Sequence, residues 1–195
     1  MNSFLEVTIL SGKSHVAMGA TTLVITMDTC VLLGNKISSL NPVLDTVKLF
    51  LMDNQNMPFV AFIILSAILF FLGCLLPDID YPYSTLGKII YIPIEHRTWT
   101  HAIWIPAALC VAGIKFRYLF WLGLGIFLHD FWVSFSSSGL DWFYPIQFKK
   151  RNHLKLYKVG EFTEYIIVAI SICLSFALTF FALQSTYHFV NISFL

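Results

Sequence analysis

The chain has very little charge. Only 12% of its 195 residues are charged and 57% are hydrophobic, whereas ordinary soluble domains hold about 25% charged and roughly 45–50% apolar residues. So few polar side chains could not cover the surface of a water-soluble globule. With a net charge of only +1, we expect no nucleic acid partner, and nothing in the sequence indicates an obligate protein partner.

Cysteine is scarce as well. The four cysteines lie singly in apolar runs, at Cys30, Cys74, Cys110 and Cys173. No two of them have the C-x2–4-C spacing of paired zinc ligands. We therefore interpret all four as small buried hydrophobic residues, and a metal site has to be sought among other residue types.

Long apolar runs are what the sequence has instead. A helix that crosses the ~30 Å hydrocarbon core of a membrane needs about 20 mostly apolar residues. Residues 57–76 and 163–185 predict two such spans, and residues 16–33 predict a third, although Asp28 interrupts it. A charged side chain inside a span is costly, so Asp28 either lies near the far membrane surface or faces a partner.

Residues 102–135 are also apolar, but they are too many for one crossing. A single helix of this length would be about 50 Å long, and Lys115 and Arg117 interrupt it. We expect a helical hairpin with spans 101–114 and 117–135. The prediction is an all-α, polytopic membrane protein with about five transmembrane helices in one integral membrane domain, residues 1–195. Four spans remain an alternative.

The Lys and Arg residues are divided unequally between the two membrane sides that five spans create. One side holds eight, namely Lys13, Lys88, Arg97, Lys149, Lys150, Arg151, Lys155 and Lys158. The other holds four, namely Lys36, Lys48, Lys115 and Arg117. Because cytoplasmic loops carry an excess of Lys and Arg, the first side is predicted to face the cytoplasm, with the basic segment 149–158 against anionic lipid headgroups.

Four histidines and two aspartates fall on that same side. One opens the first span, two follow the second, two flank the start of the third, and one lies late in the fourth. They are His15, Asp78, Asp80, His96, His101 and His129. Four separate segments thereby bring imidazole and carboxylate groups to one membrane depth, which predicts a polar site there.

Imidazole and carboxylate together suit Zn²⁺, Mn²⁺ or Fe²⁺. All six residues are therefore predicted ligands of a divalent metal, with zinc as the first choice. Pro77 and Pro82 favour an extended chain between them, in which Asp78 and Asp80 would project to one side. A lone interfacial histidine is more simply a hydrogen-bonded residue, but the convergence of several favours the metal site.

Two neighbours of His96 carry charge that such a site could use. Arg97 could bind a phosphate group with two parallel hydrogen bonds, or it could pair with a carboxylate. Glu95 could support a ligand or act as a general base.

Two segments of the chain are specific enough to suggest a family, LLPDIDYPYSTLGK and HRTWTHAIW. They resemble the YdjM-like family of bacterial inner-membrane proteins, described as metal-dependent hydrolases, some of them regulated by LexA. The family pattern is T/S-H-x-x-x-G, L-P-D-x-D, H-R-x-x-T-H-S and G-x-x-x-H-x-x-x-D-x-x-T-x-x-G with an aromatic residue and proline after it. The matching residues are Ser14, His15, Gly19, Leu76, Pro77, Asp78, Asp80, His96, Arg97, Thr100, His101, Gly125, His129, Gly139, Tyr144 and Pro145.

One ligand position departs from the family. The family's aspartate four residues after the last histidine falls on Val133, and its threonine falls on Ser136. Residues four apart share a helix face, so that aspartate would support His129, and valine cannot. Asp130, about 100° round the helix, or Asp141 could substitute; otherwise the site is reduced, binds one ion fewer or is inactive.

The resemblance implies a multi-pass, metal-dependent hydrolase of the bacterial inner membrane whose substrate is a phosphoester, most simply a lipid headgroup. In such an enzyme, we expect Arg97 to hold the substrate phosphate and Glu95 or Asp130 to handle protons. A distant likeness to zinc-dependent phospholipases C and single-strand nucleases supports this at the level of fold alone. Two alternatives stay open: a non-enzymatic protein whose cluster is a structural metal or ion-pair clamp, and a carrier or sensor of metal ions.

Overall fold

The computed structural model of the chain describes residues 2–37, 57–146 and 154–193, together with several positions between 40 and 49. Its elements are α1 (Asn2–Lys36), α3 (Phe59–Leu75), η2 (Pro77–Asp80), η3 (Trp99–His101), α4 (Trp104–Ala112), α5 (Arg117–Phe135) and α6 (Phe162–Ser193). These residues form no β-strand, only an isolated bridge between Ser136 and Tyr157. The all-α fold class is therefore confirmed. Of the basic segment 149–158, residues 149–153 lie outside the described residues.

Among the residues that the structure describes, three helices are long and apolar enough to cross a membrane. The qualifying segments are Lys13–Gly34 of α1, Arg117–Phe135 of α5 and Phe162–Thr186 of α6. Helix α3 is also apolar but shorter, with 17 residues. Large hydrophobic side chains on these helices are exposed; Phe176 on α6, for example, is 73% exposed. Such a surface fits contact with lipid better than contact with water.

The first limb of the predicted hairpin is shorter than a membrane crossing. Over residues 101–114 the chain forms the end of the 3-10 turn η3 and then α4, a helix of nine residues. At 1.5 Å per residue, α4 is about 14 Å long, roughly half the thickness of the hydrocarbon core. The chain turns back at Gly113, where a Cβ would lie only 2.7 Å from the backbone nitrogen of Phe120 on α5.

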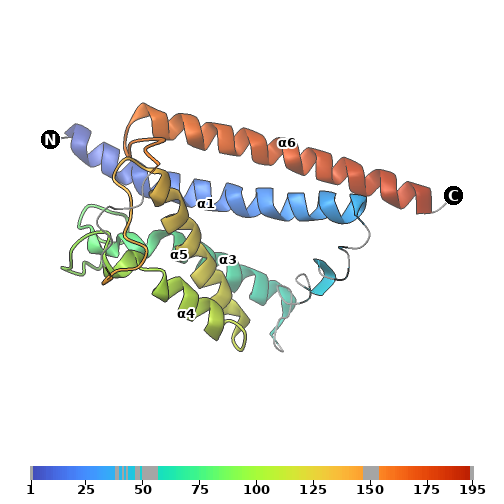
Figure 1. Ribbon diagram of the computed structural model, residues 1–195, viewed down its shortest axis with the longest axis horizontal. Helices are drawn as coiled ribbons and strands as arrows, with labels where there is room; N and C mark the ends of the chain where they lie inside the picture. The colour runs from blue at the N-terminus through green and yellow to red at the C-terminus, as the bar shows by residue number, and fades with distance from the viewer. Residues whose placement is uncertain are drawn as a thin grey trace.

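The helices are arranged so that several of their ends meet (Figure 1). Helices α1 and α6 lie side by side and run in the same direction, while α3 packs against α5 and α4 covers α5. The carboxyl ends of α3 and α5 and the beginnings of α4 and α6 gather at one end of the molecule, next to the amino-terminal part of α1. This end carries the predicted polar site.

Two glycines bring α3 and α5 into backbone contact. A Cβ at Gly125 of α5 would lie 2.2 Å from the carbonyl oxygen of Phe70, and one at Gly73 of α3 would lie 2.4 Å from that of Leu122. No side chain fits at either position, because real Cβ contacts are longer than 3 Å. This close approach places the last turn of α3 directly beside the middle of α5.

Asp28 does face a partner. Its Oδ2 accepts a hydrogen bond of 2.5 Å from the hydroxyl of Thr179, which links α1 to α6 inside the apolar part of both helices. The link lies eight residues before Lys36, the last residue of α1. It is well removed along α1 from the site at the other end, which begins at His15.

Candidate metal centre

The two aspartates after α3 do not share one face. Residues Pro77–Asp80 form a 3-10 helix instead of the extended chain that the two prolines led us to expect, so that expectation was wrong. Pro77 occupies the first turn of this helix, where its missing N–H and fixed φ are tolerated. With three residues per turn, side chains two apart diverge by about 120°. Asp78 and Asp80 therefore have different partners.

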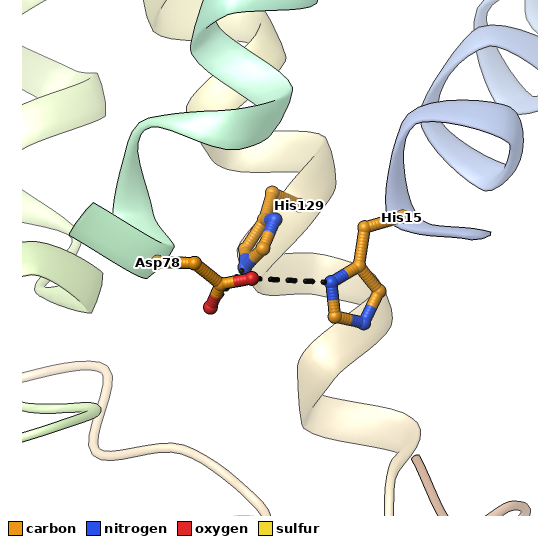
Figure 2. Close-up of side chains that lie close together, drawn as sticks. All are labelled: His15, Asp78 and His129. Carbon is orange, nitrogen blue, oxygen red and sulfur yellow. Dashed lines mark ion pairs between the residues drawn. The ribbon is translucent and has the colours of Figure 1, made fainter. Parts of the chain in front are cut away.

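Asp78 lies among three histidine rings that come from three other segments. Its Oδ2 is 3.6 Å from Nδ1 of His15 on α1, and its Oδ1 is 3.6 Å from Nε2 of both His101 and His129. Figure 2 shows its carboxylate between His15 and the ring of His129 on α5. All three rings are buried, whereas the Asp78 side chain is 13% exposed.

Hydrogen bonding fixes which nitrogen of His129 is bare. Its Nδ1 lies 2.8 Å from the backbone carbonyl oxygen of Cys74. A carbonyl can only accept, so Nδ1 carries the proton and donates it, and Nε2 keeps its lone pair. The Gly73–Gly125 contact is what brings this carbonyl within reach. The bare Nε2 is the atom that faces Asp78.

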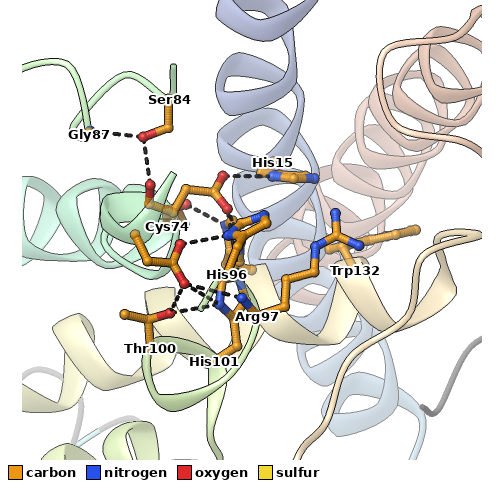
Figure 3. A network of polar contacts seen from close by, with 12 residues as sticks. His15, Cys74, Ser84, Gly87, His96, Arg97, Thr100, His101 and Trp132 are labelled. Carbon is orange, nitrogen blue, oxygen red and sulfur yellow. Dashed lines mark hydrogen bonds and ion pairs between the residues drawn. The ribbon is translucent and has the colours of Figure 1, made fainter. Parts of the chain in front are cut away.

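Hydrogen bonds that link Asp80, Thr100 and His101 likewise determine which ring nitrogen of His101 is unprotonated (Figure 3). The hydroxyl of Thr100 donates to Oδ2 of Asp80 at 2.6 Å. Its oxygen lies 3.0 Å from Nδ1 of His101 and, having given its own hydrogen to Asp80, accepts from that ring nitrogen. Nε2 of His101 is thereby left bare and faces Asp78. A carboxylate that orients a histidine from behind is a recurring feature of metal sites.

Asp80 is occupied by these supporting contacts. Its Oδ1 lies 2.6 Å from Nδ1 of His96, and its Oδ2 also accepts from the backbone N–H of Arg97 at 3.1 Å. His96 stacks on Tyr81 with ring centroids 5.1 Å apart and is partly exposed. All six predicted ligands thus come together, but only three of them, His15, His101 and His129, surround Asp78, while Asp80 and His96 lie behind His101.

Burial and charge set the protonation of the groups outside the spanning helices. Burial raises the pKa of the Asp78 carboxyl, but the electrostatic attraction of the His129 ring and the nearby nitrogens of His101 and His15 outweigh this and hold the pKa well below its usual value. Burial lowers the pKa of His101 to about 4, despite the neighbouring carboxylates. At neutral pH the carboxylate is therefore charged and the imidazole neutral, which are the forms that bind metal ions.

The arrangement fits a divalent metal ion. In the part of the chain that the structure describes, several buried atoms have no hydrogen-bond partner, among them both ring nitrogens of His15 and Nε2 of His101 and of His129. The 3.6 Å separations are too long for good hydrogen bonds. They are close to the roughly 3.3 Å between neighbouring ligand atoms of a tetrahedral zinc site with Zn–N bonds of 2.0–2.1 Å. The site is thus largely buried, holds several ring nitrogens without hydrogen-bond partners, and is of suitable size.

Within the described part of the chain, three overlapping groups of residues have ligand atoms within 4.8 Å of one another. They are His15, Asp78 and His129; Asp80, His96 and His101; and His101, His129 and Asp130. The structure thus brings Asp130, for which the sequence predicted a role in proton handling, next to the ligands. Val133 is buried and apolar, so the place where the family has an aspartate offers no ligand.

The other two predicted catalytic residues lie on the loop before η3. Glu95 is exposed, and its backbone carbonyl accepts a hydrogen bond of 2.5 Å from the Thr98 hydroxyl. Arg97 has a left-handed backbone with φ of 67°, unfavourable for a residue other than glycine. This conformation lets its N–H reach Asp80 while its Nη1 donates to the Gly139 carbonyl at 3.4 Å.

Glu164 on α6 is a further buried residue near the centre, and no role was predicted for it from the sequence. This residue is fully buried, its Oε2 accepts the N–H of Gly160 at 2.6 Å, and it is hydrogen-bonded to Ser14, the neighbour of His15. An acidic residue at the start of an otherwise apolar helix was the available signal. Through this contact α6 helps to position the amino-terminal side of the centre.

Comparison with known proteins identifies the family of this chain. The family model described as YdjM inner membrane protein matches residues 10–194, which include every predicted ligand. The chain belongs to the YdjM inner membrane protein family. No curated protein and no solved structure matches the chain. The YdjM resemblance is therefore confirmed, and the family description together with the apolar helices makes this a membrane protein.

Proposed function

We propose that this protein is a multi-pass, metal-dependent hydrolase of the inner membrane that cleaves a phosphoester in a lipid headgroup. The observation that carries the proposal is the convergence of bare, buried imidazole nitrogens on the carboxylate of Asp78. His15, His101, His129 and Asp78 would hold a divalent ion, zinc before manganese or iron, with Asp80 and His96 completing the predicted ligand set. When bound, such an ion supplies a Lewis acid and an activated water.

The residues around the centre suit a phosphate group. Arg97 lies beside the ligands and is held by Asp80 through its backbone, so its guanidinium could bind phosphate oxygens and orient phosphorus toward the centre. Glu95, exposed on the same loop, or the buried Asp130 would take the proton from the attacking water and return one to the leaving oxygen.

The surroundings favour a substrate that is already in the membrane. The loop before η3 presents isoleucines to the outside; Ile89 is 77% exposed and Ile90 is 62% exposed. Trp99 and Trp104 are also exposed nearby, as expected for aromatic residues at a membrane surface. A loop of this kind would sink into the interface and hold the centre at headgroup depth.

The side of the membrane that the proposed metal centre faces can be tested directly. The excess of Lys and Arg predicts that the centre faces the cytoplasm. A single cysteine introduced at Lys88 should react with a membrane-impermeant maleimide only in inverted vesicles, whereas one at Lys115 should react in intact cells, in each case in a chain from which the native cysteines have been removed. The opposite labelling pattern would show that the centre faces the periplasm.

The metal and the reaction need separate measurements. Detergent-purified protein should contain a stoichiometric divalent metal, and a His96→Ala His101→Ala variant that still folds should lose it. The same preparation should hydrolyse phospholipid in mixed micelles, and hydrolysis should stop in Arg97→Gln while the metal remains. If the purified protein holds no metal and the double variant folds normally, the hydrolase proposal fails.

A second candidate function is a structural clamp, and burial favours it. The three histidines nearest Asp78 are almost inaccessible to solvent, which leaves a substrate little access without movement of the Arg97 loop. A clamp would join α1, η2, η3 and α5 through the metal. It predicts that the metal raises the unfolding temperature while no phosphoester is hydrolysed at a measurable rate.

A further inference from the structure

Asp130 is a buried acid that the contacts described so far leave unexplained. It is fully buried on α5, one residue after His129, and it is the only acidic residue of that helix. Neither of its carboxylate oxygens has a hydrogen-bond partner among the described residues. A charged carboxylate in such a position is strongly destabilising unless it is paired or coordinated, so Asp130 is either protonated or holds a cationic partner.

The position of Asp130 indicates what that partner is. One of its carboxylate oxygens and one ring nitrogen each of His101 and His129 lie within 4.8 Å of one another. In both rings Nδ1 is already engaged, by Thr100 and by the Cys74 carbonyl. Only Nε2 is left to bind a metal, and in both rings this is the nitrogen that faces Asp78.

A single imidazole nitrogen has one lone pair and binds one ion. The nitrogens shared by the Asp78 group and the Asp130 group therefore cannot serve two metals at once. We infer that Asp130 is a ligand of the same ion as Asp78, so that this centre holds one ion between two carboxylates and the histidines. The inference rests on the proposed metal centre and replaces the role of proton carrier for Asp130.

Substitution by asparagine tests the inference sharply, because asparagine has the shape of a protonated aspartate but no charge. Replacing residues that merely support a ligand weakens metal binding by roughly 10- to 100-fold. Asp130→Asn should therefore lower zinc affinity by at least about 100-fold in a competition assay with a chromophoric chelator. The matched control is Asp28→Asn, the same change in another spanning helix near Thr179, which should leave the affinity unchanged.

Two further measurements report on coordination without any enzyme activity. The visible absorption of bound Co²⁺ depends on the number and geometry of its ligands, so the spectrum should change in Asp130→Asn and stay the same in Asp28→Asn. After chelation, Asp130→Asn should unfold at the same or a higher temperature than the wild type, because the buried position then holds no ionisable group. Added zinc should then stabilise the variant less than the wild type.

The outcomes distinguish failure of Asp130 as a ligand from failure of the metal centre itself. If the wild type binds zinc and Asp130→Asn binds it with the same affinity and Co²⁺ spectrum, Asp130 is not a ligand, although the metal centre stands. If the wild type itself binds no metal, the metal centre fails. Should Asp130→Asn not fold, Asp130→Cys replaces it: a thiolate-to-cobalt charge-transfer band absent from the wild type supports coordination at position 130, and no such band overturns it.

Discussion

Replacing Thr100 by valine should weaken metal binding although Thr100 is not itself a predicted ligand. Valine has nearly the same shape as threonine but no hydroxyl, so it removes the hydrogen bond to Asp80 and the one accepted from His101. Nδ1 of His101 is 3.9 Å from Oδ2 of Asp80, too far for a direct hydrogen bond. The ring would then be free to place its proton on Nε2, the nitrogen that should bind the metal.

The size of the effect follows from these contacts. A hydrogen bond to a charged group contributes about 1.5–3 kcal/mol and a neutral one about 1 kcal/mol, but Asp80 keeps its contacts with His96 and the Arg97 N–H. We therefore expect a loss of about 2 kcal/mol in the free energy of unfolding. Zinc affinity should fall by roughly 10- to 100-fold, or about 1.4–2.8 kcal/mol.

The assay compares two substitutions at one position. Zinc affinity is measured by chelator competition on detergent-purified protein, and thermal unfolding is followed with and without zinc. Thr100→Ser keeps the hydroxyl and should bind zinc nearly as the wild type does. If Thr100→Val binds zinc as tightly as Thr100→Ser, the proposed orientation of His101 through Thr100 is wrong.

Three further predictions concern packing, pH and metal removal. Gly125→Ala should reduce stability by about 1–3 kcal/mol, because its Cβ would force α5 away from the Phe70 carbonyl. The same shift would move His129 away from the Cys74 carbonyl and weaken zinc binding. A loss of stability with unchanged zinc affinity would contradict this second effect. In chelator-treated protein the unfolding temperature should fall as pH is lowered from about 6.5 to 4. Over this range the unfolded chain protonates His101 while the folded chain, with its pKa lowered by burial to about 4, does not; His101→Gln should flatten this slope. Removing metal with a chelator should lower the unfolding temperature of the wild type and zinc should restore it, whereas a His101→Ala His129→Ala variant should respond to neither.

Much of the site was predictable because each of its residues lies in, or next to, an apolar run that can be recognised from the local sequence. The apolar runs predicted the helices, and the topology then placed His15, Asp78, His101 and His129 at one end. The details that depend on contacts between distant segments were not predictable. The sequence around His129 does not indicate that its Nδ1–H will donate a hydrogen bond to the Cys74 carbonyl. That contact depends on the close approach of α3 and α5 at Gly73 and Gly125.

The local backbone after α3 was predicted incorrectly for a similar reason. Two prolines favour an extended chain, but hydrogen bonds from later residues, including the Ser84 hydroxyl to the Asp78 carbonyl at 2.6 Å, accompany a 3-10 turn instead. The role of Thr100 was not predictable either, because its hydroxyl can orient His101 only when the fold brings Asp80 within hydrogen-bond distance of it.

The assembly of the centre from distant segments also has a consequence for biosynthesis. His15 and His129 are 114 residues apart (129 − 15), so at about 5–20 residues per second the ribosome takes roughly 6–23 s to make the second after the first. During that interval His15 and Asp78 lack the ring of His129 that completes their surroundings. The part of the proposed metal site that Asp78 forms with His129 is therefore complete only after α5 has been made, so it cannot guide the folding of α1 and α3.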